Sequence, residues 1–578
     1  MKIVTVRRIS QVFFFTFFLW FCIVTTAGQS FWQLRAWPVN WFLQLDPLVA
    51  IGTILTEHSL YRGLLWALAT VVLTIIFGRF FCGWVCPFGS LHHFVGFLAH
   101  RKSPAAKKIQ LNKYRKAQRI KYFILAAMLG MAALPPISAT LQTGLLDPIA
   151  LITRSVNLVL LPIADRAAFV TSVTQRFYEG AWLILAIFLG AVLLNLIIPR
   201  FYCRFICPLG ALFALLARFA IWRIGRDKSR CIDCRFCERA CEGGCEPAGT
   251  IRISECVLCF NCRHDCEHEL ISYQTKPSPA GEIAGPDISR RGFALSLVGG
   301  IIAAPALQLS GGLGGNWLHK TIRPPGALPE PQFLKRCIKC GQCMRVCPTN
   351  VIQPAGIEGG LENLWTPVLN NRIGSSGCQL NCVACGQVCP TSAIRPISLA
   401  EKLGTDDFAD LGPIRLGTAF VDRSRCLPWA MGRACIVCQE NCPVSPKAIY
   451  TQQYYETIRN GVFTIDHADA TIIEIVEGSL TPGSFATGDY YCLFADNERR
   501  RITANTQSAI EIADDDITGL VVQAAKIEIQ IKLKKPYVDI EKCIGCGICE
   551  HECPVSGKRA IRVSADGETR NTNHKLLL

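Results

Sequence analysis

Cysteine sets the chemistry of this chain. Its 31 cysteines are too many for packing alone, and their spacing distinguishes metal ligands from disulfides. Twenty-four of them fall into six short runs, each with a fourth cysteine four residues after the third. Such a run suits a loop that wraps one corner of an iron–sulfur cubane while its last cysteine reaches a neighbouring cluster.

The first two runs lie close together and predict a two-cluster ferredoxin. The expected clusters are Cys231, Cys234 and Cys237 with Cys266, and Cys256, Cys259 and Cys262 with Cys241. Two features depart from the usual pattern. Glu242 and Glu267 stand where proline normally follows the fourth cysteine, and Cys245 competes with Cys241 as a ligand.

The other four runs all end in Cys-Pro. They are Cys337, Cys340, Cys343 and Cys347; Cys378, Cys382, Cys385 and Cys389; Cys426, Cys435, Cys438 and Cys442; and Cys543, Cys546, Cys549 and Cys553. Sixteen ligands predict four further [4Fe-4S] clusters, six in all. Zinc is the main alternative, but zinc motifs pair Cys-x-x-Cys units without the trailing Cys-Pro.

Two more cysteine pairs end apolar stretches, in "FCGWVCPFGSL" (81–91) and "YCRFICPLGAL" (202–212). In each pair, Cys82 with Cys86 and Cys203 with Cys207, the i,i+4 spacing would stack both thiols on one helix face. The following proline is expected to end or bend the helix. If the two stretches pack together, four sulfurs could hold an iron–sulfur cluster, a copper site or a redox-active dithiol pair. The alternative is four small buried apolar residues, as expected for Cys22 and Cys492.

Part of the chain belongs in a membrane. A hydrophobic fraction of 50% over 578 residues is too high for a soluble protein of this size. Four apolar runs, 10–28, 60–80, 119–142 and 181–199, are long enough to cross as helices. The loop 101–121 holds nine Lys or Arg and no acidic residue, which places it, the N-terminus and the chain after 199 in the cytoplasm. The net charge of +16 therefore indicates membrane anchoring, with no nucleic acid as a partner.

The membrane part repeats. "LQLDPLVAI" (43–51) precedes the second helix and "GLLDPIALI" (144–152) precedes the fourth. The plain interpretation is that Asp46 and Asp147 cap helices that begin with proline. The functional alternative is a quinol site, in which Asp46, Asp147, Glu57 and His58 accept protons from quinol.

A fifth helix is predicted at "ISRRGFALSLVGGIIAAPAL" (288–307), where Ser289, Arg290 and Arg291 precede an apolar stretch. This pattern is typical of a twin-arginine signal, which exports folded proteins. Export would place the C-terminal ferredoxin part on the periplasmic side. The alternative is a short buried helix, with the whole chain on the cytoplasmic side.

The expected fold is a membrane α-helical bundle of four helices in two repeats plus a fifth, with α+β ferredoxin-like domains. The predicted domains are 1–225 (membrane), 226–275 (two-cluster ferredoxin), 276–325 (linker with the fifth helix) and 326–578 (four-cluster ferredoxin). Residues 450–535 form a β insertion, because "TIIEIV" (471–476) and "KIEIQIKL" (526–533) indicate strands. This insertion would either dock a redox partner or cover the clusters.

These residues resemble two known protein types joined end to end. Residues 1–275, with their two Cys-x-x-x-Cys-Pro stretches and two-cluster tail, resemble the NapH or MauN type of membrane ferredoxin. Residues 288–578, with "LWTPVL", "CLPWAMGRACIVCQENCP" and "CIGCGICEHECP", resemble the NapG or MauM type of four-cluster ferredoxin.

The resemblance implies an electron carrier in the inner membrane of a bacterium or archaeon, with quinol oxidation as its only enzymatic step. Electrons would pass between the quinone pool and a periplasmic reductase or cytochrome. In related four-cluster ferredoxins the runs pair in nested fashion. Carried over, Cys337, Cys340 and Cys343 would take Cys553; Cys543, Cys546 and Cys549 would take Cys347; Cys378, Cys382 and Cys385 would take Cys442; and Cys426, Cys435 and Cys438 would take Cys389.

Two other functions stay open. The membrane cysteine pairs also resemble those of CcoG-type proteins linked to copper reduction, although that family is expected to end in an immunoglobulin-like domain. Cofactor maturation for an oxidoreductase, as with MauM and MauN, is the other alternative.

Overall fold

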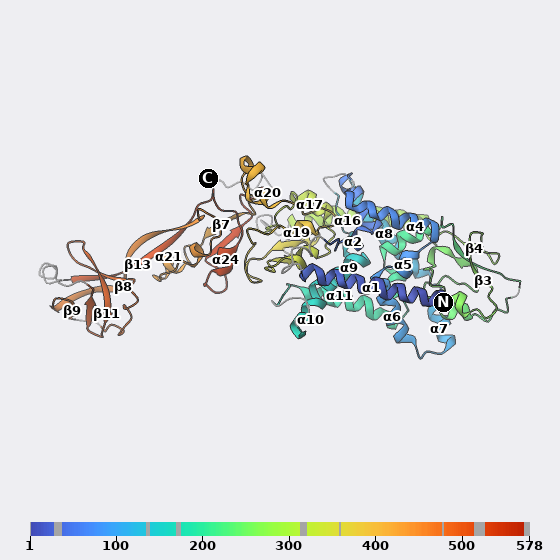
Figure 1. Cartoon of the computed structure of the whole chain (residues 1–578), viewed down its shortest axis with the longest axis horizontal. Helices are drawn as coiled ribbons and strands as arrows, with labels where there is room; N and C mark the ends of the chain where they lie inside the picture. The colour runs from blue at the N-terminus through green and yellow to red at the C-terminus, as the bar shows by residue number, and fades with distance from the viewer. Residues whose placement is uncertain are drawn as a thin grey trace. The chain divides into compact units, whose positions relative to one another are not determined.

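Figure 1 shows the computed structural model of the chain, which divides into two compact units. The first comprises Met1–Ser375, Asn381–Ile414 and Arg570–Asn573, and the second comprises Ser376–Leu380, Arg415–Thr569 and His574–Leu578. The structure describes residues 2–27, 37–59, 61–134, 139–168, 175–229, 231–312, 321–357, 360–476, 479–513 and 526–570.

The first unit is mainly helical up to residue 217. Its helices are α1 (Ile3–Ala27), α2 (Trp41–Gln44), α3 (Pro47–Glu57), α4 (Trp66–Phe77), α5 (Phe80–Trp84), α6 (Pro87–His100), α7 (Ala105–Asn112), α8 (Ile120–Ala132), α9 (Pro148–Ser155), α10 (Leu161–Ala168), α11 (Ala181–Leu193), α12 (Phe201–Phe205) and α13 (Pro208–Ala217). A π-helical turn, Val156–Leu160, joins α9 to α10.

Three described helices are long and apolar enough to cross a membrane: Ile3–Thr25, Pro148–Ala167 and Arg290–Ser310. The first and last coincide with predicted spans. The predicted spans 60–80, 119–142 and 181–199 instead contain the shorter helices Arg62–Phe77, Ile120–Ala132 and Ala181–Leu196. The sequence did not predict the span Pro148–Ala167, which other parts of the unit cover.

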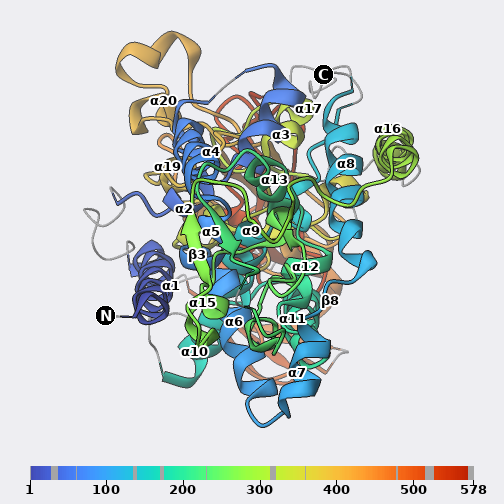
Figure 2. The same ribbon diagram turned by 90° about the vertical axis from the view of Figure 1, so that its right-hand side faces the viewer.

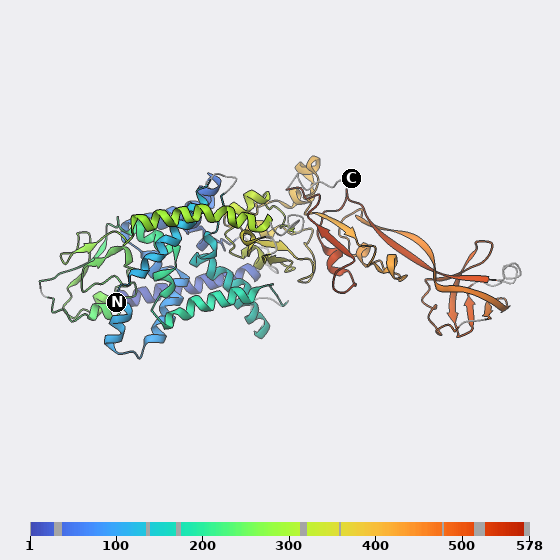
Figure 3. The ribbon, with the colours of Figure 1, turned by 180° about the vertical axis from the view of Figure 1, so that it is seen from behind.

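Two ferredoxin-like parts flank these helices in the first unit. One contains β1 (Arg223–Arg226) paired with β3 (Ile271–Gln274), and β2 (Ile251–Arg252) paired with β4 (Glu282–Ile283). The other contains β5, β6 and four helices: β5 (Ile352–Pro354), β6 (Pro367–Leu369), α17 (Glu330–Arg336), α18 (Gln342–Val346), α19 (Ala384–Gln387) and α20 (Leu399–Leu403). Figures 1 and 3 show β3 and β4 at one end of the long helices and α17 and α19 at the other.

The long helix α16 (Arg290–Gly312) connects the two ferredoxin-like parts and packs closely on α8. Figure 2 looks nearly along α16 and shows it beside α8. At Gly130 and Gly300 the two backbones approach so closely that a Cβ would lie 2.5 Å from the Leu297 carbonyl oxygen and 2.0 Å from the Ala127 carbonyl oxygen, respectively. Small residues allow this approach between helices.

We expect Gly300→Leu to loosen α16 and to destabilise the protein by about 1–3 kcal/mol, because a clash with backbone cannot be relieved by side-chain rotation. Gly299→Leu is the matched control, since a Cβ at Gly299 meets no atom within 4 Å. The measurement is the rate of proteolysis in detergent. Equal rates for the two variants would contradict this packing.

The second unit combines a ferredoxin-like part with a barrel. The first contains β7 (Thr418–Val421) paired with β14 (Ile561–Ser564), together with α21 (Leu427–Ala430), α22 (Val437–Glu440) and α24 (Ile548–Glu552). The barrel is closed, in the order β10 (Tyr490–Leu493), β11 (Arg499–Asn505), β12 (Ala509–Ile512), β9 (Ile472–Ile475), β8 (Ile449–Ala468) and β13 (Lys526–Val538).

The predicted strands 471–476 and 526–533 are confirmed by β9 and β13. Alternate residues of β13, Ile527, Ile529 and Ile531, are buried in the barrel. Figures 1 and 3 show the long arms of β8 and β13 carrying the barrel away from α21 and α24. The barrel therefore does not cover the cysteines of its own unit, and docking of a redox partner on it stays a prediction.

Candidate iron–sulfur sites

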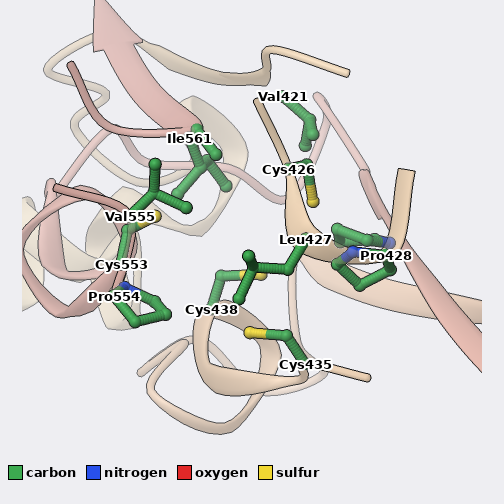
Figure 4. Close-up of a pocket in the computed structure, with 12 residues that line it drawn as sticks. Val421, Cys426, Leu427, Pro428, Cys435, Cys438, Cys553, Pro554, Val555 and Ile561 are labelled. Carbon is green, nitrogen blue, oxygen red and sulfur yellow. The ribbon is translucent and has the colours of Figure 1, made fainter. Parts of the chain in front are cut away.

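Three pockets are each lined by four cysteines. In the first unit, Cys337, Cys340, Cys343 and Cys389 line one of them. In the second unit, Cys426, Cys435, Cys438 and Cys553 surround another (Figure 4), and Cys442, Cys543, Cys546 and Cys549 line the third.

These groupings correct the nested pairing. Cys389, rather than Cys553, completes the first run; Cys553 completes the third; and Cys442 completes the fourth. The physical reason is that runs share a cluster when they fold in the same unit. The pairing is therefore first with second and third with fourth, as in two successive two-cluster ferredoxins. Of the other cysteines in the first two of these runs, Cys347, Cys382 and Cys385 belong to the first unit.

The donors and the lining of the pockets fit cubanes. Beside the sulfurs, the pocket of Figure 4 is lined by apolar residues such as Val421, Leu427 and Ile561, and its empty volume is about 360 Å³. Among the described residues, no three His, Cys, Asp or Glu side chains converge on a point that one metal ion could occupy. A cubane is wider than a single ion and holds its four ligands further apart.

Burial gives these thiols another reason to bind iron. It raises the pKa of Cys337 to about 11 and that of Cys438 and Cys546 to about 12. Without a cation the thiols would stay neutral and poorly solvated. Coordination to iron removes their protons and balances the charge of the thiolates.

We expect Cys553→Ser to remove the cluster of the pocket in Figure 4 and to leave that of Cys337 intact. Iron should fall by about four per chain, the content of one cubane. Cys389→Ser should instead remove the cluster of Cys337. The measurement is EPR of the reduced protein, with Cys337→Ser as the reference for the signal of its own cluster. Loss of that signal in Cys553→Ser, together with its retention in Cys389→Ser, would restore the nested pairing.

The cysteines of the two-cluster ferredoxin part interact electrostatically across both runs. Cys241 interacts with Cys256, Cys259 and Cys262, and Cys237 interacts with Cys241, Cys262 and Cys266. The expected partition stays a prediction. The Sγ atoms of Cys245 and Cys241 are 3.4 Å apart. A hydrogen bond from the Cys245 thiol lowers the pKa of Cys241 to about 7. The choice of Cys241 rather than Cys245 as the ligand stays a prediction.

The cysteine pairs of the membrane part lie at breaks between helices. Cys82 is in α5, which ends at Trp84, whereas Cys86 caps α6 and its Sγ accepts the Gly89 N–H at 3.3 Å. In the same way, Cys203 is in α12, and Cys207 caps α13 by accepting the Gly210 N–H at 3.1 Å. The prediction of two thiols stacked on one continuous helix is therefore wrong. As predicted, a helix ends just before each Cys-Pro, α5 at Trp84 and α12 at Phe205. Pro87 and Pro208 then begin the next helices, because proline suits the first helical position.

The structure nevertheless brings these four sulfurs together. Cys86 interacts electrostatically with Cys82 and Cys203, and Cys207 interacts with the other three. We call Cys82, Cys86, Cys203 and Cys207 the membrane quartet. Three buried cations face it: Arg79 interacts with Cys82 and Cys207, Arg200 with Cys82 and Cys203, and Lys121 with Cys207. These charges can balance an anionic thiolate cluster.

Two buried glutamates fasten the two-cluster ferredoxin part beside the quartet. Glu242 forms ion pairs with Arg7 at 2.8 Å, Arg200 at 2.7 Å and His93 at 3.1 Å. Burial alone would raise the pKa of Glu242, but these three partners hold it well below its usual value. This explains why glutamate replaces the proline expected after Cys241.

Glu255, just before Cys256, is held in the same way. It pairs with Lys121 at 2.5 Å and accepts hydrogen bonds from Tyr122 at 2.8 Å and Gln118 at 3.1 Å. Burial opposes ionisation, yet Lys121 and Arg79 lower its pKa. Sequence reasoning noticed Glu242 only as an irregularity and missed Glu255, since neither belongs to a ligand pattern.

The other end of the helices holds the pocket of Cys337. Arg154 donates to the Lys339 carbonyl at 3.0 Å, and Tyr178 donates to that of Met344 at 3.2 Å. Thr56 donates to the carbonyl of Lys335 at 2.9 Å. Cysteine groups therefore lie at both ends of the helical part. The membrane quartet is close to the two-cluster ferredoxin part, because Trp84, which lies between Cys82 and Cys86, donates a hydrogen bond to the Leu258 carbonyl at 3.0 Å.

The residues considered for quinol binding do not form one site. Asp46 and Asp147 are fully buried at the starts of α3 and α9, where the helix-cap interpretation is confirmed. Glu57 is at the opposite end of α3, about 16 Å along the axis, paired with Arg336 at 3.1 Å. His58 follows it as the C-cap. The structure thus separates the two aspartates from Glu57 and His58.

Comparison with known proteins supports this chemistry. The family model described as "4Fe-4S binding domain" matches residues 59–105 and 181–228, whose cysteines are those of the membrane quartet, and two further models of that description match residues 333–353 and 534–555. No solved structure matches.

Three relatives share part of the chain. The uncharacterized protein MJ0749 of Methanocaldococcus jannaschii is 30% identical over 272 residues, which is 47% of this chain and 87% of that protein. The ferredoxin-type protein NapH of Escherichia coli is 24% identical, over 47% of this chain and 88% of NapH. The regulatory protein NosR of Pseudomonas aeruginosa is 26% identical, over 39% of this chain but only 30% of NosR. With its 4Fe-4S domains and candidate membrane helices, the chain belongs to the family of these proteins, the NapH-type membrane polyferredoxins.

Proposed function

We propose that this protein conducts electrons across the inner membrane through six [4Fe-4S] clusters and a centre held by the membrane quartet. One observation carries the proposal: the first unit has cysteine groups at both ends of its helical part and a cysteine quartet between them, in which Cys86 and Cys207 are buried and Cys82 and Cys203 are half-buried. Electrons would exchange with the quinone pool in the membrane and leave to a redox partner through the clusters of the second unit.

The route inside the first unit is continuous. Cys86, Cys207 and Cys340 belong to one apolar core, so the quartet and the pocket of Cys337 are joined by packed protein rather than by water. On the other side, Arg79 donates to the Ser254 carbonyl at 2.9 Å, which lies two residues before the ligand Cys256. Packed protein of this kind favours one-electron transfer between centres.

The proposed topology follows from charge. The basic loop 101–121 and the two-cluster ferredoxin are on the cytoplasmic side, and the pocket of Cys337 is on the periplasmic side. Helix α16, which begins with Arg290 and Arg291, makes the crossing that the twin-arginine pattern predicts. The start of α16 follows the two-cluster ferredoxin in the chain. Near its other end, the Ser310 hydroxyl accepts a hydrogen bond from the Leu361 N–H, so α16 extends from one ferredoxin-like part of the first unit to the other.

Copper reduction has less support. The matching family models describe 4Fe-4S binding, and they include the two stretches with the membrane cysteine pairs. Cofactor maturation would use the same electron route and differs only in the partner.

Sealed vesicles test the proposal. Protein inserted in vesicles, with dithionite outside and ferricyanide trapped inside, should reduce the ferricyanide much faster than protein-free vesicles do. Iron and sulfide should each reach about 24 per chain before the quartet is counted. Ferricyanide reduction at the protein-free rate in a fully loaded protein would overturn the transmembrane route.

A further inference from the structure

Lys339 is a buried lysine in the wall of the pocket of Cys337. It lies between the ligands Cys337 and Cys340 and lines the pocket together with Cys343 and Cys389. Lys339 is only 2% exposed. Among the described residues, no other charged side chain lines this pocket or the two cysteine pockets of the second unit.

The loop position of Lys339 has the same backbone conformation in four of the cysteine runs. The angle φ is 52° at Asp233, 50° at Leu258, 57° at Lys339 and 67° at Gly545. Residues other than glycine rarely adopt such left-handed values. At Gly545 a Cβ would lie 2.4 Å from the Gly417 carbonyl oxygen, so glycine is required there. The cysteine loop therefore fixes the conformation, and the runs differ in the charge that they place at this position.

Leu258 and Lys339 also contact the helical part in the same way. The Leu258 carbonyl accepts a hydrogen bond from Trp84 at 3.0 Å, and the Lys339 carbonyl accepts one from Arg154 at 3.0 Å. Both loop residues are buried. Two equivalent loops, one at each end of the helical part, therefore carry an apolar side chain in one case and a cation in the other.

Neutral acceptors hold the ammonium group of Lys339. Its Nζ donates to Gln142 Oε1 at 2.6 Å and to the Glu362 backbone carbonyl at 2.9 Å. The guanidinium group of Arg154, which donates to the Lys339 carbonyl, adds a second buried cation, whereas the side chain of Glu362 supplies an anion. Positive charge is therefore in excess beside the pocket.

We propose that Lys339 raises the reduction potential of the centre held in the pocket of Cys337 and so favours electron entry there from the membrane quartet. The inference rests on the proposed function, because it requires an iron–sulfur centre in this pocket. Reduction adds one electron, and with it one negative charge, and no proton is taken up. A fixed positive charge in low-dielectric protein stabilises the added charge, since little water is present to screen it.

A redox titration of the full chain in detergent, followed by EPR, tests this role. The signal of the centre is identified by its loss in Cys337→Ser. At the midpoint potential of the unchanged protein, Lys339→Met should lower the ratio of reduced to oxidised centre at least about tenfold, which corresponds to about 59 mV for one electron. Lys339→Arg keeps the charge and should keep the ratio within about threefold of the unchanged protein.

Gln142→Glu tests the same place without altering the cysteine loop. A carboxylate in contact with Nζ offsets the charge of Lys339, so the ratio should again fall. Asp233→Asn is the matched control at the equivalent loop position. The Asp233 side chain is 81% exposed, so water screens its charge, and the ratio for its own centre should change less than about threefold.

Three results would overturn the role of Lys339. They are an unchanged ratio in Lys339→Met, a fall in Lys339→Arg as large as that in Lys339→Met, and an unchanged ratio in Gln142→Glu. The last decides the question even if Lys339→Met does not assemble the centre. Failure of the transmembrane route would show separately, as absent electron flow into vesicles by a protein whose potential shifts as expected.

Discussion

Serine at both Cys82 and Cys203 is expected to reduce electron transfer into vesicles to the protein-free rate. The two residues come from different helices, α5 and α12, and each supplies one of the two sulfurs of its stretch. Removing both leaves only the capping residues Cys86 and Cys207, which are too few to hold a cluster. Electrons would then have to pass from the cytoplasmic ferredoxin to the pocket of Cys337 without an intermediate centre.

The iron content separates a lost centre from a lost fold. The double variant should keep the iron of its six ferredoxin clusters and lose only that of the quartet. Cys22→Ser is the matched control, because Cys22 is a buried cysteine of the same helical part that joins no cysteine group. A double variant that transfers electrons as fast as the unchanged protein would show that the quartet is not on the route.

The sequence predicted the ligands far better than their grouping. Ligand spacing is local, so Cys337, Cys340 and Cys343 could be recognised without knowing the fold. The fourth ligand comes from another run, and its identity depends on which runs fold together. Cys389 and Cys553 both precede proline, so nothing local distinguishes them.

Helix positions were also easier to predict than helix lengths. Hydropathy located the apolar runs, but Cys86-Pro87 and Cys207-Pro208 act as helix starts, which sequence patterning alone interpreted as stops. A proline after a residue with a polar side chain fits both interpretations. Only the partner of that side chain, here the N–H of Gly89 or Gly210, decides between them.

One of the two departures from the ferredoxin motif corresponds to a tertiary contact. Glu242 and Glu267 both replace the expected proline, yet only Glu242 is buried among cations, whereas Glu267 is exposed. The same departure from the motif therefore has a structural cause in one run and none in the other. Tertiary partners far along the chain, such as Arg7, supply the difference.

Glu242→Gln is expected to detach the two-cluster ferredoxin part from the membrane quartet. The substitution leaves Arg7 and Arg200 buried without their anion, and breaking a buried ion pair in this way costs about 3–5 kcal/mol. Electron transfer into vesicles should fall at least tenfold, while the iron content should be retained, because the glutamate itself is not a ligand. Hydrogen exchange of residues 236–265 should accelerate as this part undocks.

Glu267→Gln provides a control at the equivalent position of the second run. It changes the same residue type, one position after a cluster ligand, but removes no buried ion pair, since Glu267 is exposed. Electron transfer and hydrogen exchange should therefore match those of the unchanged protein. If both substitutions slowed electron transfer equally, the effect would arise from the charge beside the cluster, and docking through Glu242 would be excluded as the cause.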